Sequence, residues 1–157
     1  MSITLVLVDD QVLFRKGLKE LILSFGGMTV PADADNSEEL AAMLSKKTVM
    51  PDVCIISSPA FMKHNSRDIR EMKRKYDKTK ILVLGAYPEE FAVTSLYSLK
   101  VNGFMLRNSK PAERKKAIID MQRRGRYWPG FAREVIKTID PENIPVSDIK
   151  PRHQKFL

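Results

Sequence analysis

Apolar and polar stretches alternate along this chain in a regular order. Runs rich in Val, Ile and Leu, typical of strands buried on both faces, are each followed by a segment with apolar residues at helical spacing. The alternation repeats five times. The predicted strands are 3–8, 28–34, 53–57, 80–85 and 103–106.

The predicted helices have recognisable start and stop signals. Gly26 and Gly27 end a first helix over 11–25, and Asn36 caps a second that begins with "SEELAAML". A third helix precedes the strand at 80–85. Prolines open the fourth (88–99) and fifth (111–123) at their first turns. From Gly125 the chain is expected to be irregular.

Five strand–helix units of this length predict an α/β fold: a three-layer αβα sandwich around a five-stranded parallel sheet with right-handed crossovers. Ligands of such sheets bind beyond the carboxyl ends of the strands, at the switch in strand order. The candidate site residues are therefore those that end or follow a strand. These are Asp9, Asp10, Ser57, Ser58, Gly85, Ala86, Leu106 and Arg107.

Asp9 and Asp10 are the first candidate pair. Two adjacent carboxylates repel unless a cation or a basic side chain neutralises them, and hard oxygen ligands suit Mg²⁺. Asp10 is alternatively a cap of the helix that follows. Ser57 is a poor nucleophile without a neighbouring base. His64 falls on the loop after that strand, where it is more often a bystander.

Composition narrows the classes of function. The chain has 157 residues, a formal charge of +8 and one cysteine, Cys54, which excludes an internal disulfide and a multi-cysteine metal site. It has no apolar run near the ~20 residues that span a bilayer and no secretory signal pattern, so no membrane association and a cytoplasmic location are expected. The basic runs favour solvated helix faces over a nucleic-acid patch.

Several segments in order resemble the receiver domain of LuxR-type DNA-binding response regulators. They are "LVLVDDQVLFRKGLKELI" (5–22), "PDVCIIS" (51–57), "KILVLGAYPEE" (80–90), "VNGFMLRNSKPAERKKAI" (101–118) and "RGRYWPGFA" (124–132). The resemblance implies a flavodoxin-like (βα)5 receiver with strand order 2-1-3-4-5 over residues 1–132 and a linker over 133–148. It also implies that 149–157 begin a truncated helix-turn-helix domain.

Receivers usually accept a phosphoryl group from a histidine kinase on an aspartate, with Mg²⁺ bridging. By the resemblance, Asp9 and Asp10 match the acidic pair, and Ser57 occupies the acceptor position. Gly85 and Arg107 occupy the positions of a Thr or Ser and of a lysine, while Phe104 matches an aromatic that switches rotamer.

Of these five site positions, Asp9 and Asp10 keep the usual residues, whereas Ser57, Gly85 and Arg107 have changed together. A serine acceptor removes one charge and one metal ligand, and Gly85 has no hydroxyl to bind a phosphoryl oxygen. An arginine can bind a carboxylate in a bidentate pair. We therefore expect an atypical receiver that forms no aspartyl phosphate and binds Mg²⁺ weakly or not at all. We further expect Arg107 to bridge to Asp9 or Asp10, although a solvent-facing Arg107 is an alternative.

The expected role is signal reception in a bacterial transcription regulator, without enzymatic activity. Its expected partners are a second copy, through the first and fifth or the fourth and fifth helices, and a histidine kinase or another regulator. Val12, Leu13 and Val101 are candidate contacts at those helices, or core residues. DNA binding is expected only through a carboxyl-terminal domain. The alternative is a free-standing interaction module that regulates a partner protein.

Overall fold

The computed structural model describes residues 2–58, 63–85 and 90–140. Five parallel strands form one sheet in the order β2-β1-β3-β4-β5, as the resemblance implied. The strands are β1 (Ile3–Val8), β2 (Met28–Ala34), β3 (Val53–Ser58), β4 (Lys80–Gly85) and β5 (Gly103–Leu106). The helices are α1 (Val12–Ser24), α2 (Ser37–Leu44), α3 (Lys63–Lys75), α4 (Glu90–Ser98), α5 (Pro111–Arg124) and α6 (Gly130–Ile139).

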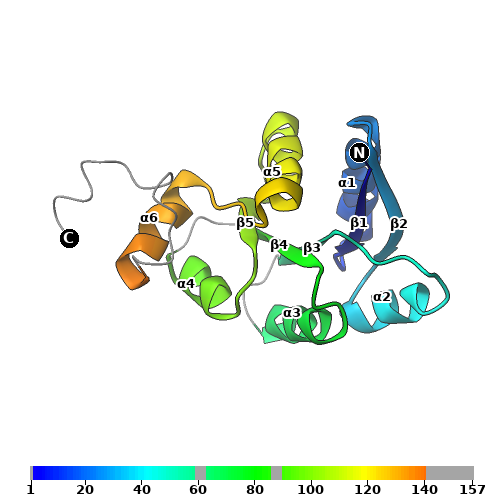
Figure 1. Ribbon diagram of the computed structural model, residues 1–157, viewed down its shortest axis with the longest axis horizontal. Helices are drawn as coiled ribbons and strands as arrows, with labels where there is room; N and C mark the ends of the chain where they lie inside the picture. The colour runs from blue at the N-terminus through cyan, green and yellow to red at the C-terminus, as the bar shows by residue number, and fades with distance from the viewer. Residues whose placement is uncertain (1, 59–62, 86–89, 141–157) are drawn as a thin grey trace.

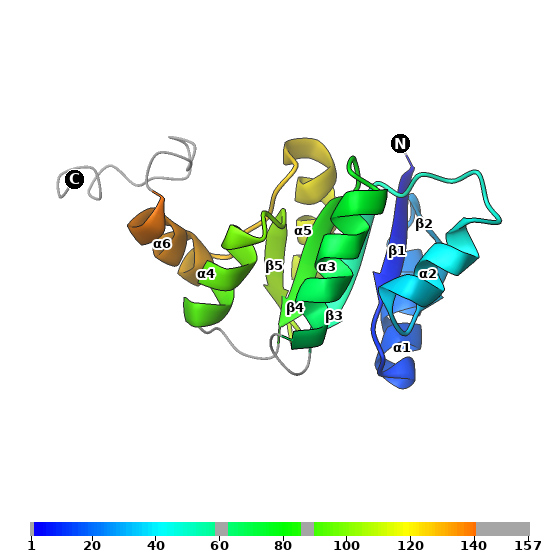
Figure 2. The ribbon, with the colours of Figure 1, turned by 90° about the horizontal axis from the view of Figure 1, so that it is seen from below.

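Helices cover both faces of the sheet (Figures 1 and 2). Leu18 and Ile22 of α1 pack with Ile118 of α5 against one face. The opposite face is covered by α2, α3 and α4, and its core includes Leu40, Ile69, Met72, Val93 and Leu96. The predicted three-layer αβα architecture is therefore confirmed.

Local signals account for several helix ends. The side-chain oxygen of Asn36 accepts a hydrogen bond of 2.8 Å from the backbone N–H of Glu39, which caps α2 as predicted. Pro111 lies in the first turn of α5, and Gly125 ends that helix with a left-handed φ of 77°. Asp10 is not the cap of α1, because Gln11 occupies that position and makes no side-chain capping bond.

The stretch after Gly125 differs from the expectation. It contains α6, whose residues Ala132 and Ile136 are buried in the same core as α4. The rings of Tyr97 and Trp128 meet edge to face at 6.2 Å. The predicted linker, 133–148, thus begins inside a packed helix, because an apolar stripe on α6 is buried against α4. Its remaining residues from 141, and the predicted start of a second domain at 149–157, lie outside the described residues.

None of the described helices has the length and apolar character needed to cross a bilayer.

Candidate functional site

Asp9 lies at the carboxyl end of β1 and is almost fully buried, with 2% of its surface exposed. Its Oδ1 accepts a hydrogen bond of 2.8 Å from the backbone N–H of Gln11. Its Oδ2 lies 3.2 Å from Nη2 of Arg107. Both carboxylate oxygens therefore already have partners within the protein.

Arg107 follows β5 and reaches across the sheet end. Its backbone N–H donates to the carbonyl of Gly85 at 2.8 Å, which ties the start of the loop to β4. Its Nη2 donates to Asp9 and to Oε1 of Gln11, and its guanidinium lies 3.8 Å from the centre of the Phe14 ring. The structure thus contains the predicted bridge, and it runs to Asp9. Asp10 is exposed to solvent.

Phe14 and Gln11 are site residues that the sequence did not single out. Gln11 could have been identified from its position, because it directly follows the two carboxylates at the end of β1. Phe14 belongs to the helix predicted over 11–25, and its half-buried ring contacts the Arg107 guanidinium. A guanidinium over an aromatic face is stabilised by the ring quadrupole, so Phe14 helps to hold Arg107 in place.

Ser57 is the penultimate residue of β3 and is 5% exposed. Because Val8 of β1 pairs with Ile56 of β3, Asp9 and Ser57 follow at the next positions of adjacent strands. The Ser57 hydroxyl has no hydrogen-bond partner among the described residues. His64 does not lie on a loop as expected but in the first turn of α3, because that helix begins at Lys63.

Gly85, the last residue of β4, leaves space that Phe104 fills. A Cβ built on Gly85 would lie 2.6 Å from Cζ of Phe104 and closer still to its Cε1. Phe104 is fully buried, and its ring meets that of Phe131 edge to face at 5.9 Å. The aromatic residue at this position therefore points inward, and any larger residue at position 85 would displace it.

Arg114 of α5 organises the loop that presents Arg107. Its Nη2 donates to the carbonyl of Arg107 at 2.5 Å, and its Nε donates to the carbonyl of Ser109 at 2.9 Å. Burial and the neighbouring Arg107 charge lower the pKa of Arg114. The basic runs of the sequence were expected to form solvated helix faces, but Arg114, which belongs to one of them, is only 9% exposed.

A buried ion pair between Arg15 and Asp33 contacts the backbone of Asp9. Arg15 donates through Nη1 to the backbone carbonyl of Asp9 at 2.6 Å and through Nε to Asp33 at 2.7 Å. Its Nη1 also lies 2.5 Å from Asp35. Burial opposes the charged form of Arg15, but hydrogen bonds to Asp35 and Asp33 outweigh it and raise the pKa. No local sequence pattern signals the pair of Arg15 and Asp33, because it forms between α1 and β2.

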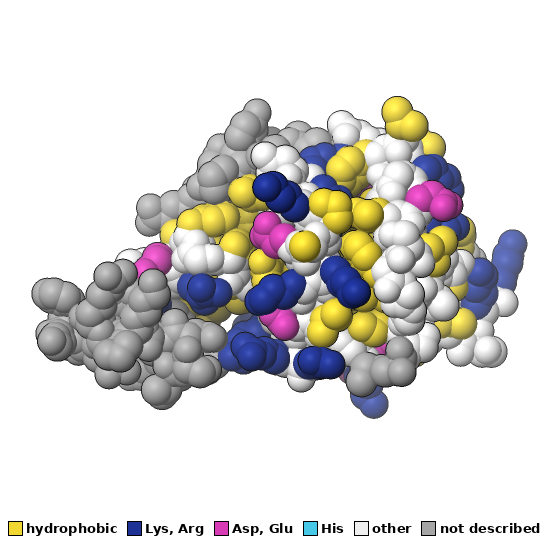
Figure 3. Space-filling model, turned by 90° about the horizontal axis from the view of Figure 1, so that it is seen from above, with side chains coloured by type: hydrophobic (Ala, Val, Ile, Leu, Met, Phe, Trp, Pro, Cys, Tyr) yellow, Lys and Arg dark blue, Asp and Glu magenta, His cyan; other side chains and the backbone are white. Residues whose placement is uncertain are grey.

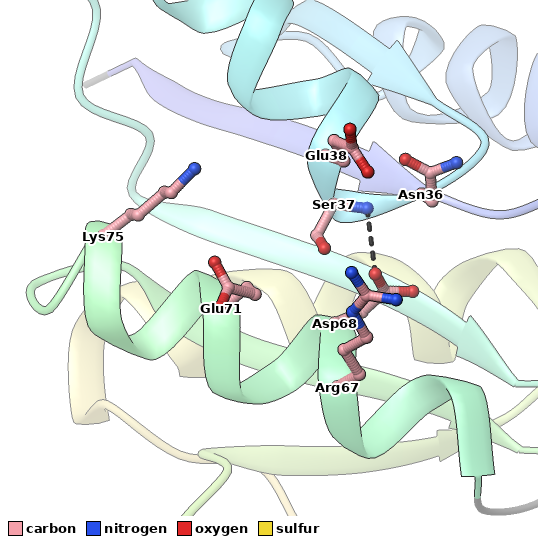
Figure 4. A pocket seen from close by; sticks show the side chains of 7 residues that line it. All are labelled: Asn36, Ser37, Glu38, Arg67, Asp68, Glu71 and Lys75. Carbon is pink, nitrogen blue, oxygen red and sulfur yellow. Dashed lines mark hydrogen bonds between the residues drawn. The ribbon is translucent and has the colours of Figure 1, made fainter.

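A separate polar hollow of about 490 Å³ lies between α2 and α3 (Figure 4). Oδ1 of Asp68 accepts a hydrogen bond of 2.9 Å from the backbone N–H of Ser37, so this carboxylate satisfies a donor at the start of α2. Arg67, Glu71 and Lys75 also line it, and the charges are mixed. Asp68 therefore has a structural role at the start of α2. Among the described residues, no cluster of three or more His, Cys, Asp or Glu could hold a metal ion.

Comparison with known proteins gives sequence relatives among transcription regulators. No protein-family model matches the chain. It is 25% identical over 137 residues to the transcriptional regulatory protein DegU of Brevibacillus brevis, covering 87% of this chain and 57% of DegU. It is 27% identical over 122 residues to the probable regulator NarL of Mycobacterium tuberculosis, covering 76% and 54% respectively. The chain thus spans little more than half the length of either regulator.

Solved structures agree on the fold. A LuxR-family two-component response regulator from Aurantimonas sp. superposes with a TM-score of 0.74 at 22% identity, over 88% of this chain and 99% of that one. The isolated receiver domain of RcsB from Salmonella enterica, in the presence of BeF3⁻, gives 0.71 at 17%, over 86% and 99%. RcsB dimers bound to DNA give 0.74 at 16%, over 99% and 74%. The chain therefore has the fold of response-regulator receiver domains and has sequence relatives among transcriptional regulatory proteins, in agreement with its sequence resemblance.

Proposed function

We propose that this chain is the signal-receiving part of a DNA-binding response regulator that forms no aspartyl phosphate. The observation that carries the proposal is the pair of Asp9 and Arg107 beside Ser57. The carboxylate that a metal would need is bound to a guanidinium, and the acceptor position has a neutral hydroxyl.

Phosphoryl transfer requires an activated nucleophile. An aspartate is anionic at neutral pH, whereas a serine hydroxyl needs a base to remove its proton. Ser57 Oγ makes no hydrogen bond to a base among the described residues. Gly85 adds no hydroxyl for a phosphoryl oxygen, and Phe104 fills the space beside it. The chain therefore acts as a regulator without enzymatic activity.

The residues at the strand ends do not fit a Mg²⁺ ion. Mg²⁺ requires nearly octahedral oxygen coordination, commonly with one or two carboxylates. Both oxygens of Asp9 already accept hydrogen bonds, Asp10 is exposed, and Ser57 supplies no charge. A cation at Asp9 would have to displace Arg107, so we propose that Arg107 replaces the metal as the counter-ion of Asp9.

The scaffold then signals through its surfaces, and the α1–α5 face is the best candidate. In α1, Leu13 is 88% and Val12 is 51% exposed. A groove of about 310 Å³ beside them is lined by α1 and the start of α5. Figure 3 shows apolar side chains mixed with Lys and Arg on this side of the sheet. The surface of α4 is a weaker candidate for the contact, because α6 packs on α4. Val101, the candidate contact beside α4, is a buried core residue.

We therefore propose that two copies associate through α1 and α5. RcsB has been solved as dimers bound to DNA, and this likeness supports dimerisation as the output of the fold. DNA binding would come from a carboxyl-terminal domain, for which residues 149–157 are the proposed start, and the input from a histidine kinase or another regulator. The receiver part includes α6 and extends beyond the boundary at 132.

Calorimetric titration with Mg²⁺ tests the proposed pocket. The wild-type chain should give no saturable heat at millimolar Mg²⁺. The double variant Ser57→Asp, Arg107→Lys should bind Mg²⁺ measurably, because it restores a carboxylate and frees Asp9 from the fork of the guanidinium. Saturable millimolar binding by the wild type would contradict the proposal.

A further inference from the structure

Three turns meet at the amino-terminal ends of β4 and β5, at the edge of the sheet opposite the candidate site. Asn102 joins two of them, because its Oδ1 accepts a hydrogen bond of 2.9 Å from the backbone N–H of Ile81 and its Nδ2 donates to the carbonyl of Gly125 at 3.1 Å. At the end of α3, Nζ of Lys73 donates to the carbonyl of Lys100 at 3.0 Å. The segments brought together are 73–80, 99–102 and 123–127.

These segments carry a large excess of positive charge. They contain nine Lys or Arg residues and one carboxylate, Asp77. Arg74 is paired, with Glu71 at 2.9 Å, but six of the nine make no ion pair with a carboxylate of the described residues. Figure 3 shows Lys and Arg side chains gathered in the lower middle of the molecule. The six residues, here called the basic edge, are Lys73, Lys78, Lys80, Lys100, Arg123 and Arg124.

The fold changes what the sequence predicted for these residues. Each basic run taken alone was expected to be a solvated helix face. In the structure, two of the runs and the separate Lys100 converge on one edge, with the side chain of Lys80 beside Gly125. Cations that are held together without carboxylate partners favour a polyanionic ligand.

Lys100 supplies an independent observation, because its backbone has a conformation that favours glycine. Its φ is 61°, and it is the one residue other than glycine with a positive φ in the described part of the chain. It follows the end of α4, where its N–H donates to the carbonyl of Tyr97 at 3.0 Å. Glycine is preferred at this position after a helix because it has no Cβ. A lysine here lowers stability, so its exposed side chain is a candidate for a role outside the fold.

We propose that the basic edge binds the phosphate backbone of duplex DNA without reading its sequence. Lys and Arg neutralise phosphates and release condensed counter-ions, so such binding depends strongly on salt and little on sequence. The choice of DNA rests on the proposed function, in which a carboxyl-terminal domain reads the bases. The basic edge adds contacts from the receiver part itself.

Fluorescence anisotropy of a short labelled duplex, titrated with the full chain, tests the proposal. Duplexes of two unrelated sequences should bind equally well, with a Kd below about 100 μM at low salt. If all six cations contact phosphates, log K should fall against log salt with a slope of about −5. Polyglutamate is titrated in parallel, as a probe for an acidic protein partner. Absence of duplex binding, or binding of polyglutamate alone, overturns the proposal.

The variant Lys100→Gly separates binding from stability. It should raise Tm by about 2–4 °C, because glycine tolerates the left-handed φ. It should also lower the affinity for the duplex about eightfold at ~0.1 M salt, because each phosphate contact contributes about 0.9 to the salt slope. A change that only weakened the fold would lower both values. Unchanged affinity in Lys100→Gly overturns the proposal.

Matched double variants separate the basic edge from the net charge of the chain. Adding Lys78→Ala to Lys100→Gly should lower the affinity about 60-fold at ~0.1 M salt and make the salt slope shallower by about 2. The control, Lys46→Ala with Arg67→Ala, removes the same charge from exposed residues after α2 and in α3. It should change the affinity less than about twofold. Equal losses in the two double variants would mean that net charge alone governs binding, which overturns the proposal.

The outcome can be separated from that of the proposed function. Duplex binding by the basic edge does not depend on the chemistry at position 57. A covalent phosphoryl group on Ser57 would contradict the proposed function, whatever the duplex titration gives. Absence of duplex binding would contradict only the role of the basic edge.

Discussion

Arg107 and Asp9, which are 98 residues apart in the chain, form an ion pair of 3.2 Å at the carboxyl end of the sheet. Because Asp9 is buried, solvent screens the attraction between these two charges less than it screens an exposed ion pair. Its presence gives the acidic residue a counter-ion from the protein. The degenerate site is thus an internally neutralised arrangement around Asp9.

The contact between Gly85 and Phe104 predicts a costly substitution. Gly85→Ala should destabilise the fold by about 1–3 kcal/mol, because its Cβ would overlap the Phe104 ring. Denaturant unfolding measures this. Gly17→Ala is the control, since a Cβ there meets nothing within 4 Å and should stabilise α1 by about 0.5–1 kcal/mol. If both changes had the same effect, the packing of Phe104 against Gly85 would be wrong.

The buried Asp33 predicts a loss of stability in acid. Burial would raise its pKa, but hydrogen bonds from Lys16 and Arg15 outweigh burial and lower it. Its stabilising contribution is therefore complete above the pKa of the unfolded chain, near 4, and is lost as pH falls through the lower folded value.

Asp33→Asn should cost about 3 kcal/mol at neutral pH, because it leaves Arg15 without its buried partner. It should also flatten the decline in stability below pH 4. Asp120→Asn, which breaks only the surface pair with Lys116, should cost about 0.5 kcal/mol or less. Urea unfolding across pH provides both values, and an unchanged acid slope in Asp33→Asn would count against this assignment.

Because α6 is packed in the core, substitutions beyond the expected domain boundary at 132 should lower the free energy of unfolding. Ile136 is 3% exposed and packs with the α4 core, so Ile136→Ala should lose about 2–4 kcal/mol. Ile139 lies on the same helix and is 44% exposed, so Ile139→Ala should cost under about 1 kcal/mol. Equal small effects in chemical denaturation would mean that α6 does not belong to the folded unit.

Self-association through α1 and α5 should depend on Leu13 and on salt. Leu13→Glu should weaken dimerisation at least about tenfold by placing a charge in an apolar contact. Added salt should strengthen it, because exposed Lys115, Lys116, Arg123 and Arg124 repel across the interface. Sedimentation equilibrium measures both. Met50→Glu, at another exposed apolar residue, is the control; an equal loss there would place the contact elsewhere.

The sequence predicted what depends on local pattern. Apolar runs marked β1, β3, β4 and β5, and the weaker pattern "MTVPADA" marked β2. Asn36 and Pro111 marked helix starts by capping and by fixed φ. The Arg107–Asp9 bridge could be foreseen because the resemblance placed both charges at the carboxyl edge of the sheet. Since β3 and β4 lie between β1 and β5, the long Arg107 side chain makes this contact across the edge.

Features that depend on packing between elements were missed. The fit of Phe104 over Gly85 and the pairing of Arg15 with Asp33 require coordinates, since neither has a local pattern. The helix α6 did have a signal: Ala132 and Ile136 have helical spacing. The expectation of an irregular chain from Gly125 overlooked that signal. Pro129 occupies the N-cap position of α6 and makes no side-chain capping bond.

The central claim concerns covalent chemistry at position 57, and intact-mass spectrometry after incubation with acetyl phosphate and Mg²⁺ tests it most directly. The wild-type chain should keep its mass, because a serine without a base cannot take the phosphoryl group. The double variant Ser57→Asp, Arg107→Lys is the positive control. A wild-type mass increase of one phosphoryl group, located on Ser57 by fragmentation, would contradict the account.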